Sequence, residues 1–456
     1  MFKNKIVNSL SNNGYLVICL FIITILVLSL IPNQFLNAKN NREETYKQLS
    51  LFGDVFQRVQ EQYVEEVTDK KLIESAISGM LQSLDPHSSY LSSDDYSEMR
   101  VKTKGTFGGL GIEITQENGV VKVVSPIDDT PAYRAGMLPG DLIIGIEGKS
   151  IRGLPLNKAV EKLRGPVGSS VKITVLRKDK DPFELTIIRA IIKIQSVKHN
   201  VINDVGYIRL TTFSETTTKS MLEAIEKIKK STGSKFQGLI LDLRNNPGGL
   251  LNQSISVSDA FLHNGEIVST KGRNKSDASR IFAQPGDVIE NEPLVILINS
   301  GSASASEIVA GALKDHGRAI ILGTRSFGKG SVQSIIPLPG NGAIRLTTSR
   351  YYTPSGISIQ AKGIDPDIIV EARTIKQDKN ISSNIREEDL TGALDKNTKN
   401  IEKKNIDLEK NKINKLLEDN QISRAVDLIK GIKLYSKKIN SINKIVVKNK
   451  NFKNIS

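Results

Sequence analysis

The sequence predicts an α/β (α+β) core, preceded by a smaller β-rich section and flanked by helical segments. Two largely apolar runs, residues 239–243 and 294–298, are typical of buried strands. Each run leads into a turn of small residues and then into a helical pattern, so strands and helices alternate over residues 191–372. The chain has no Trp and few aromatic residues, and we therefore expect aliphatic side chains to fill the core.

Residues 1–38 are predicted to direct the chain out of the cytoplasm. Residues 15–31 carry no charge and approach the length of about 20 residues that a membrane-spanning helix needs. Two lysines and no acidic residue precede this run, which predicts a single-pass anchor in the inner membrane with the rest of the chain in the periplasm. A cleaved signal peptide, with secretion, is the alternative, although Leu36 is large for position −3 of a cleavage site after Ala38. The only cysteine, Cys19, lies in this run, so the exported part has neither a disulfide nor a cysteine nucleophile.

The net charge of +14 raises the question of nucleic-acid binding. More than half of the excess lies in a tail rich in Lys and Asn, residues 373–456, where aromatic residues are almost absent. We therefore predict no nucleic-acid partner, and a basic, partly disordered tail with a short helical hairpin at residues 413–417 and 425–432. Contact of the tail with an anionic membrane surface is the alternative.

Residues 39–104 are predicted to form a helical region. The spacing of apolar residues predicts amphipathic helices over residues 43–65 and 70–84. A turn at residues 85–91 follows the second helix and contains His87. A histidine that follows Asp-Pro in a turn is more often structural than catalytic, and we expect a structural role for His87.

Residues 105–190 differ from the rest, because short β-rich runs alternate there with turn signals and two short helical patches. The run at residues 108–112, Gly-Gly-Leu-Gly-Ile, opens this section. Its successive amides can bind the terminal carboxylate of a peptide, while the next strand edge accepts the peptide. Together with residues 135–143, Ala-Gly-Met-Leu-Pro-Gly-Asp-Leu-Ile, the section resembles a PDZ domain. The candidate substrate-binding residues are Gly109, Leu110, Gly111, Ile112 and Arg164, and for the arginine a solvated side chain is the alternative.

A serine-rich turn follows the apolar run at residues 294–298, and a helical pattern over residues 307–316 follows the turn. Free backbone N–H groups and the positive end of the dipole at a helix N-terminus favour a developing oxyanion. The arrangement therefore suggests acyl transfer by a serine. Serines also cap helices without any catalytic role. The four serines of the turn are Ser300, Ser302, Ser304 and Ser306.

A serine hydroxyl needs a base to become a good nucleophile. Asp315 and His316 follow Ser304 on the same helix at a distance of about 16–18 Å, which is too far for a hydrogen bond. Lys329 is the other candidate, and its pKa would have to fall by about 3 units, roughly 4 kcal/mol, for it to accept a proton at neutral pH. Its two flanking glycines allow close backbone approach, and Phe327 can exclude water. The alternative is a solvated loop lysine.

Residues 323–330 nearly match the phosphate-binding pattern G-x-x-x-x-G-K-[ST] and follow a strand-like run. Gly330 replaces the hydroxyl residue that binds Mg²⁺, and residues 331–339 are typical of a strand rather than of a helix. We therefore expect no nucleotide, no other cofactor and no metal.

Five segments resemble the carboxyl-terminal processing peptidases, also called tail-specific proteases, and occur in the same order. They are residues 242–251, 301–319, 327–333, 352–356 and 363–367. The resemblance extends from about residue 51 to residue 372 and implies a ClpP/crotonase-like serine peptidase core with a PDZ domain. It further implies that Ser304 is the nucleophile, that Lys329 is the general base and that Gln333 orients the lysine.

The resemblance also implies the oxyanion hole and the substrates. The backbone N–H groups of Ala305 and of Gly248 or Gly249 would bind the oxyanion, and the sequence does not decide between the glycines. In some members of the family, the aspartate at the position of Asp315 is credited with a relay role. Because Asp315 lies far from Ser304 along the helix, we expect a structural role for it. The substrates would be proteins or peptides that are recognised by their free C-terminal tails. The enzyme would cleave them at internal peptide bonds, as an endopeptidase does. Whether the chain forms a homo-oligomer stays open.

Two other functions are compatible with parts of the sequence. One is a PDZ adaptor with an inactive protease core, and the intact Ser304, Lys329 and Gln333 count against it. The other is a crotonase-like acyl-CoA enzyme, which would have neither the PDZ section nor the export segment.

Overall fold

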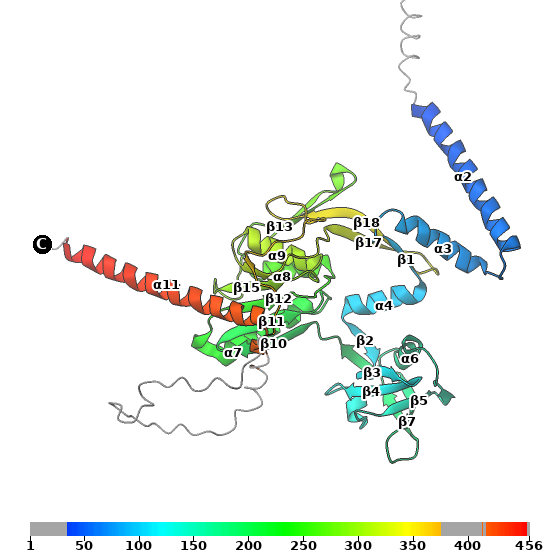
Figure 1. Ribbon diagram of the computed structural model, residues 1–456, viewed down its shortest axis with the longest axis horizontal. Helices are drawn as coiled ribbons and strands as arrows, with labels where there is room; N and C mark the ends of the chain where they lie inside the picture. Colours follow the sequence, from blue (N-terminus) through cyan, green and yellow to red (C-terminus); the bar gives the residue numbers. More distant parts are fainter. Residues whose placement is uncertain (1–33, 375–412, 414–415, 454–456) are drawn as a thin grey trace, which may run out of the picture. The chain divides into compact units, whose positions relative to one another are not determined.

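The computed structural model describes residues 34–374, 413 and 416–453 (Figure 1). It divides into two compact units, Met1–Leu84 and Asp85–Ser456.

The described part of the first unit consists of two helices, close to the two that the sequence predicts. They are α2 (Gln34–Gln62) and α3 (Asp69–Gln82). Thr68 caps α3 by accepting a hydrogen bond from the backbone N–H of Lys71. The apolar run at residues 15–31 lies outside the described residues. Of the helices that are described, none has the length and apolar composition to cross a membrane.

The second unit contains a six-stranded sheet whose strands alternate with helices. In spatial order its strands are β10 (Val197–Ile202), β11 (Val205–Leu210), β12 (Leu239–Asp242), β15 (Leu294–Ile298), β16 (Ile320–Gly323) and β19 (Ile368–Ile369). Strands β11 to β19 run parallel, and β10 is antiparallel at one edge. Every residue of β12 and β15 is buried, as expected for the central strands of a parallel sheet with helices on both faces.

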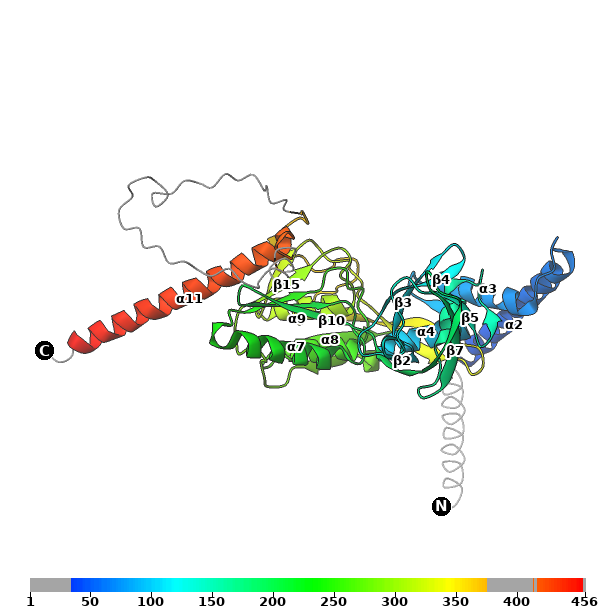
Figure 2. The same cartoon turned by 90° about the horizontal axis from the view of Figure 1, so that it is seen from below.

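Helices cover the two faces of this sheet (Figure 2). One face carries α7 (Thr217–Thr232), α8 (Leu251–Asp259) and α9 (Ala305–Asp315), and the other carries α11 (Asn420–Lys453). Successive side chains along each strand point to opposite faces of the sheet, and the two faces therefore have separate apolar clusters. Leu241 and Ile296 belong to the cluster with the first three helices, and Ile240, Val295 and Leu297 to the cluster with α11.

The helix α11 differs from the short hairpin arm that the sequence suggested for residues 425–432. It is a single helix of 34 residues. Its buried residues Ile422, Ala425, Val426 and Ile429 repeat at helical spacing and cover the apolar sheet face. The physical reason for the difference is that these four residues form an apolar stripe that packs on the sheet. The strands of that sheet are remote in sequence from the helix.

A second sheet of the same unit carries the lysine segment. Its strands are β1 (Ser89–Leu91), β18 (Ala343–Tyr352), β13 (Glu266–Gly272), β14 (Ser279–Phe282) and, paired with β18, β17 (Ser331–Pro337). The short strand β1 pairs antiparallel with β18, with Ser89 opposite Arg345. The turn at residues 85–88 is thereby brought to the strands that follow Lys329.

The β-rich section has a sheet and an apolar core of its own. Val123, Ile143, Ile173 and Val175 are fully buried in that core. The ribbon of β2 (Thr106–Gly109) and β9 (Ala190–Lys193) joins the beginning of the section to its end. The other elements, with the preceding helix, are α4 (Ser93–Lys104), β3 (Ile112–Glu117), β4 (Val120–Pro126), α5 (Pro131–Arg134), β5 (Leu142–Ile146), β6 (Lys149–Ser150), α6 (Leu156–Leu163), β7 (Ser170–Leu176) and β8 (Phe183–Ile188).

Candidate active site

Ser304 lies between the end of β15 and the beginning of α9, in a strained backbone conformation. Its φ is 54° and its ψ is −112°, and it is 7% exposed. Such strain in a non-glycine residue persists only where the surroundings enforce it. Two hydrogen bonds hold the preceding loop: the Ser302 hydroxyl donates to the Leu243 carbonyl at 2.8 Å, and the Ala303 N–H donates to the Asn246 carbonyl at 3.0 Å.

The buried carboxylate of Glu307 connects Ser304 with the lysine loop. Its Oε2 accepts hydrogen bonds from the backbone N–H groups of Ser304 at 2.7 Å and Lys329 at 2.9 Å. Its Oε1 accepts from the Gly328 N–H and the Ser326 hydroxyl, both at 2.6 Å. One side chain thus fixes the backbone of the candidate nucleophile and that of the candidate base.

The environment of Glu307 shifts its affinity for protons. Burial raises the pKa of this carboxyl, and the hydrogen bonds from Ser326 and from the backbone of Gly328, Ser304 and Lys329 oppose that effect. The serine turn stood out in the sequence, but Glu307 was not assigned a role there. The available signal was the S-x-x-E spacing from Ser304, which is the pattern of a capping box.

Lys329 is half-buried, and its pKa is lowered from the ordinary 10.5. The main cause is burial, to which the positive charge of Arg345 adds, while Asp85 and Glu307 act in the opposite direction. Its neighbour Gly330 lies against the backbone of Gln360: a Cβ on Gly330 would come within 2.3 Å of the Gln360 nitrogen. The lysine thus has the direction of pKa shift that a general base requires.

The turn at residues 85–88 contributes charge beside Lys329. Asp85 Oδ1 accepts from the backbone N–H groups of His87 at 2.8 Å and Ser88 at 2.9 Å, and from the Thr347 hydroxyl at 3.1 Å. The pKa of His87 is lowered by burial and next by the charge of Lys329, so these two side chains interact electrostatically. The sequence analysis did not connect this turn with Lys329, because more than 200 residues separate them.

Gln333 lies on β17 and is half-buried. Its side-chain amide donates to the Ser331 hydroxyl at 2.9 Å and to the Thr347 hydroxyl at 3.4 Å. Since Thr347 donates in turn to Asp85, these bonds connect β17, β18 and the 85–88 turn. That Gln333 orients Lys329 stays a prediction.

Of the two candidate glycines, Gly248 lies against the candidate nucleophile, Ser304. A Cβ at Gly248, where φ is 100°, would come within 2.9 Å of the Ser304 Cβ and 3.0 Å of the Ala305 nitrogen. A Cβ at Gly249 would instead meet the carbonyl oxygen of Phe213 at 2.1 Å. The Gly248 N–H donates to Asn246 Oδ1 at 2.9 Å, so this amide already has a partner in the structure.

Asp315 and His316 lie at the end of α9 opposite to Ser304. Asp315 Oδ2 accepts from the Ser355 backbone N–H at 2.9 Å, and the Nε2 of His316 contacts the Glu266 carbonyl oxygen at 2.7 Å. Both side chains therefore bind local backbone groups.

Tyr351 is a buried residue near Ser304 to which no sequence motif drew attention. Its N–H donates to the Gly330 carbonyl at 2.7 Å, which places it next to the lysine loop. Burial raises the pKa of its phenol to about 12, and a hydrogen bond with Ser304 opposes this shift. The phenol is therefore protonated at every working pH.

The candidate substrate-binding residues of the β-rich section line one cavity of about 180 Å³. Gly109, Leu110, Gly111, Ile112 and Arg164 all contribute to it. The rest of the lining is apolar and consists of Phe107, Ile114, Val160 and Leu163. The Arg164 guanidinium lies 4.5 Å from the centre of the Phe107 ring, and its Nε is buried without a hydrogen-bonding partner.

Three segments of the chain match family models. Residues 204–370 match peptidase family S41, residues 122–177 match the PDZ domain, and residues 29–95 match the N-terminal domain of the activating protease CtpB.

Relatives along most of the chain are proteases. A carboxy-terminal-processing protease of Bartonella bacilliformis is 56% identical over 357 residues, which cover 78% of this chain and 82% of that protein. The carboxy-terminal processing protease CtpA of Bacillus subtilis is 35% identical over 318 residues, 69% of this chain and 67% of that protein. Among solved structures, the photosystem II D1 C-terminal processing protease is 29% identical with a TM-score of 0.41, and the match covers 70% of this chain and 92% of that one.

The chain belongs to the carboxy-terminal-processing protease family, which are serine-type peptidases of family S41 with a PDZ domain. The family and the fold class that the sequence motifs predicted are therefore confirmed.

The four bonds to Glu307 generate a prediction. In Glu307→Gln, an NH₂ group replaces one of the two carboxylate oxygens. The two donors that bind that oxygen in the wild type then have no acceptor. We expect the free energy of unfolding to fall by about 1–3 kcal/mol, because buried donors lose their acceptor. We expect peptidase activity to fall about a hundredfold, since the backbone of Ser304 and Lys329 is no longer fixed. Thermal unfolding and steady-state kinetics measure the two effects.

The matched control is Glu223→Gln on the exposed side of α7. Equal stability and equal activity of Glu307→Gln and this control would show that the carboxylate does not hold the site.

Proposed function

We propose that the chain is an active endopeptidase in which Ser304 is the nucleophile and neutral Lys329 is the general base. The observation that carries the proposal is the Glu307 carboxylate, which binds the backbone N–H groups of both residues through one oxygen. The lowered pKa of Lys329 supports it, because only the neutral amine can accept a proton.

The proposed reaction proceeds through an acyl-enzyme. Lys329 Nζ takes the proton of the Ser304 hydroxyl as Oγ forms a bond to the carbon of the scissile carbonyl. The oxyanion that develops is bound by the Ala305 N–H at the N-terminus of α9 and by an N–H of the adjoining glycine loop, where Gly248 lies closest to Ser304. When the C–N bond breaks, Lys329 returns the proton to the leaving amine. Water then hydrolyses the ester by the same route in reverse.

We further propose that the PDZ domain selects substrates by their C-terminal residue. The 180 Å³ cavity has room for a small apolar side chain, and its walls are aliphatic and aromatic. The unpartnered Nε of Arg164 is a donor beside the backbone of residues 109–112, where a terminal carboxylate can bind.

The location of the protein is also a proposal. The uncharged run at residues 15–31 and the two lysines before it support an anchor in the inner membrane, with the peptidase in the periplasm. Extraction of membranes at alkaline pH tests the anchor, because only an integral protein stays in the pellet. A cleaved segment would leave the protein soluble.

The first prediction from the proposed function tests the two proposed catalytic groups. Ser304→Ala and Lys329→Ala should each abolish cleavage of an unfolded protein with an apolar C-terminus, while the fold persists. Lys329→Arg should be equally inactive, because a guanidinium stays charged and cannot accept the proton. Product formation is followed by gel electrophoresis and folding by circular dichroism. Full activity in any of these variants would refute the pair. A wild-type chain that binds but never cleaves such substrates would support the adaptor instead.

The second prediction concerns pH. The neutral form of Lys329 accumulates above its pKa in the folded enzyme, so kcat/KM should rise with pH through that value, which lies below 10.5. Arg345→Gln removes a positive charge that lowers the pKa, and the rise should therefore move to higher pH. Arg350→Gln on the exposed side of the same strand removes the same charge and should leave the profile in place. If the rise of kcat/KM occurs at the same pH in Arg345→Gln as in the wild type, Lys329 is not the group that causes the rise.

The third prediction concerns Arg164. Arg164→Gln should weaken binding of a peptide with a free, small apolar C-terminal residue by about tenfold, because a charge-assisted hydrogen bond is lost. The same peptide with an amidated C-terminus should bind weakly to wild type and variant alike. Fluorescence anisotropy measures both affinities, and Arg152→Gln, at an exposed position of the same domain, is the control. An undiminished preference for the free carboxylate in Arg164→Gln would remove this residue from the site.

A further inference from the structure

Arg244 directly precedes the loop at residues 245–248, which contains Gly248, and binds the beginning of α11. It lies two residues after the end of β12 and is 8% exposed. Its Nε and Nη2 donate to the two oxygens of Asp242 at 3.0 and 2.7 Å. Its Nη1 donates to Asp419 Oδ2 at 2.8 Å and to Gln421 Oε1 at 2.6 Å. These last two acceptors come from the far end of the chain.

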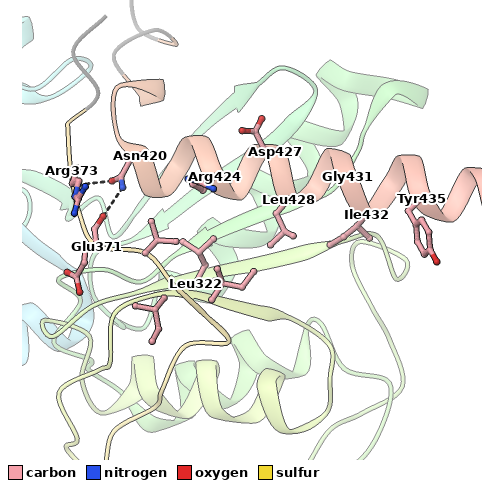
Figure 3. A pocket seen from close by; sticks show the side chains of 13 residues that line it. Leu322, Glu371, Arg373, Asn420, Arg424, Asp427, Leu428, Gly431, Ile432 and Tyr435 are labelled. Atoms are coloured by element: carbon pink, nitrogen blue, oxygen red, sulfur yellow. Dashed lines mark hydrogen bonds between the residues drawn. The ribbon is translucent and has the colours of Figure 1, made fainter.

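Residues 419–421 are themselves tightly bound. Asp419 Oδ1 accepts from the backbone N–H groups of Gln421 at 3.0 Å and Ile422 at 3.2 Å, and so caps α11. The Gln421 amide donates to the Val370 carbonyl at 2.6 Å. Figure 3 shows Asn420 between Arg373 and Glu371, accepting from the backbone N–H of the first and donating to the carbonyl of the second, both at 2.7 Å.

The residues after Arg244 contact the serine turn. The Asn245 N–H donates to Asn299 Oδ1 at 2.9 Å, and the Asn299 amide donates back to Asn245 Oδ1 at 2.9 Å. The Asn246 carbonyl accepts from the Ala303 N–H at 3.0 Å and the Ser306 hydroxyl at 2.9 Å. A shift of Arg244 therefore passes to residues on both sides of Ser304.

We propose that Asp419 and Gln421 are positioning residues for the peptidase: by binding Arg244 they hold the 245–248 loop against the Ser304 turn, so that catalysis depends on the docked beginning of α11. The proposal rests on the proposed function of Ser304. Without these two acceptors, the Nη1 of a buried guanidinium has no partner, and the side chain has to move to find water. That movement starts one residue before the loop that carries Gly248.

The contact is distinct from the packing that holds the helix. The stripe of Ile422, Ala425, Val426 and Ile429 covers the sheet face through apolar contact alone. Asp419 and Gln421 add little apolar area to it, but they accept hydrogen bonds from Arg244, which directly precedes the 245–248 loop. Stability of α11 and the geometry of the active site can therefore be separated by substitution.

The test uses Asp419→Asn in the full chain. Asn caps helices about as well as Asp, so the beginning of α11 stays capped while the Nη1 of Arg244 loses its charged acceptor; Asp242 still binds Nε and Nη2. We expect kcat to fall about tenfold or more, with little change in KM or in the temperature of unfolding. The rate at which a fluorophosphonate probe labels Ser304 should fall in parallel. Asp427→Asn makes the same charge change at an exposed position of α11 and should leave all four quantities unchanged.

A second variant keeps the test decisive if Asp419→Asn also loses stability. Ile429→Ala leaves a cavity in the stripe and destabilises the docking without touching Arg244. Below its unfolding temperature it should keep a normal kcat. The proposal is wrong if Asp419→Asn has the kcat and the labelling rate of wild type. It is also wrong if Asp419→Asn behaves like Ile429→Ala, so that its activity falls only by the fraction of molecules that are unfolded. An inactive wild-type chain would instead overturn the proposed function itself.

Discussion

The arrangement of the active site depends on one buried carboxylate, that of Glu307. Three backbone N–H groups and one hydroxyl converge on its two oxygens, from the start of α9 and from the lysine loop. These donors are buried, and leaving them without an acceptor is costly. A carboxylate is suited to this position because both of its oxygens accept, whereas an amide would accept at only one. The relative placement of Ser304 and Lys329 is therefore set by a residue that need not take part in the reaction.

The chemistry of Lys329 results from a balance around it rather than from burial alone. Burial and the Arg345 charge lower its pKa, and the two acidic neighbours Asp85 and Glu307 raise it. If the negative neighbours dominated, the amine would stay protonated and could not act as a base. Since Arg345 also donates to the His87 carbonyl at 3.1 Å, the strand β18 fixes both the positive charge and the turn that brings the negative one.

The sequence was informative wherever a local pattern determines a local structure. The apolar runs of β12 and β15 and the serine turn after β15 took the form that their spacing predicts. What it could not supply were pairings between distant segments. The contacts of Glu307 appear only when residues 326–329 fold back onto α9, and only the folded backbone shows that Gly248 lies against Ser304 while Gly249 lies against Phe213.

Two segments outside the matched peptidase region, one before it and one after it in the sequence, bind the core through the same kind of contact. In each, an aspartate caps its own turn and also binds a residue of the core: Asp85 accepts from Thr347, and Asp419 accepts from Arg244. A turn aspartate suits this task because one carboxylate has more acceptor positions than the local N–H groups fill. The S41 match covers residues 204–370, yet one aspartate precedes it and the other follows it. The surroundings of Ser304 and Lys329 therefore include Asp85, from the segment before the PDZ domain, and, through Arg244, the beginning of α11.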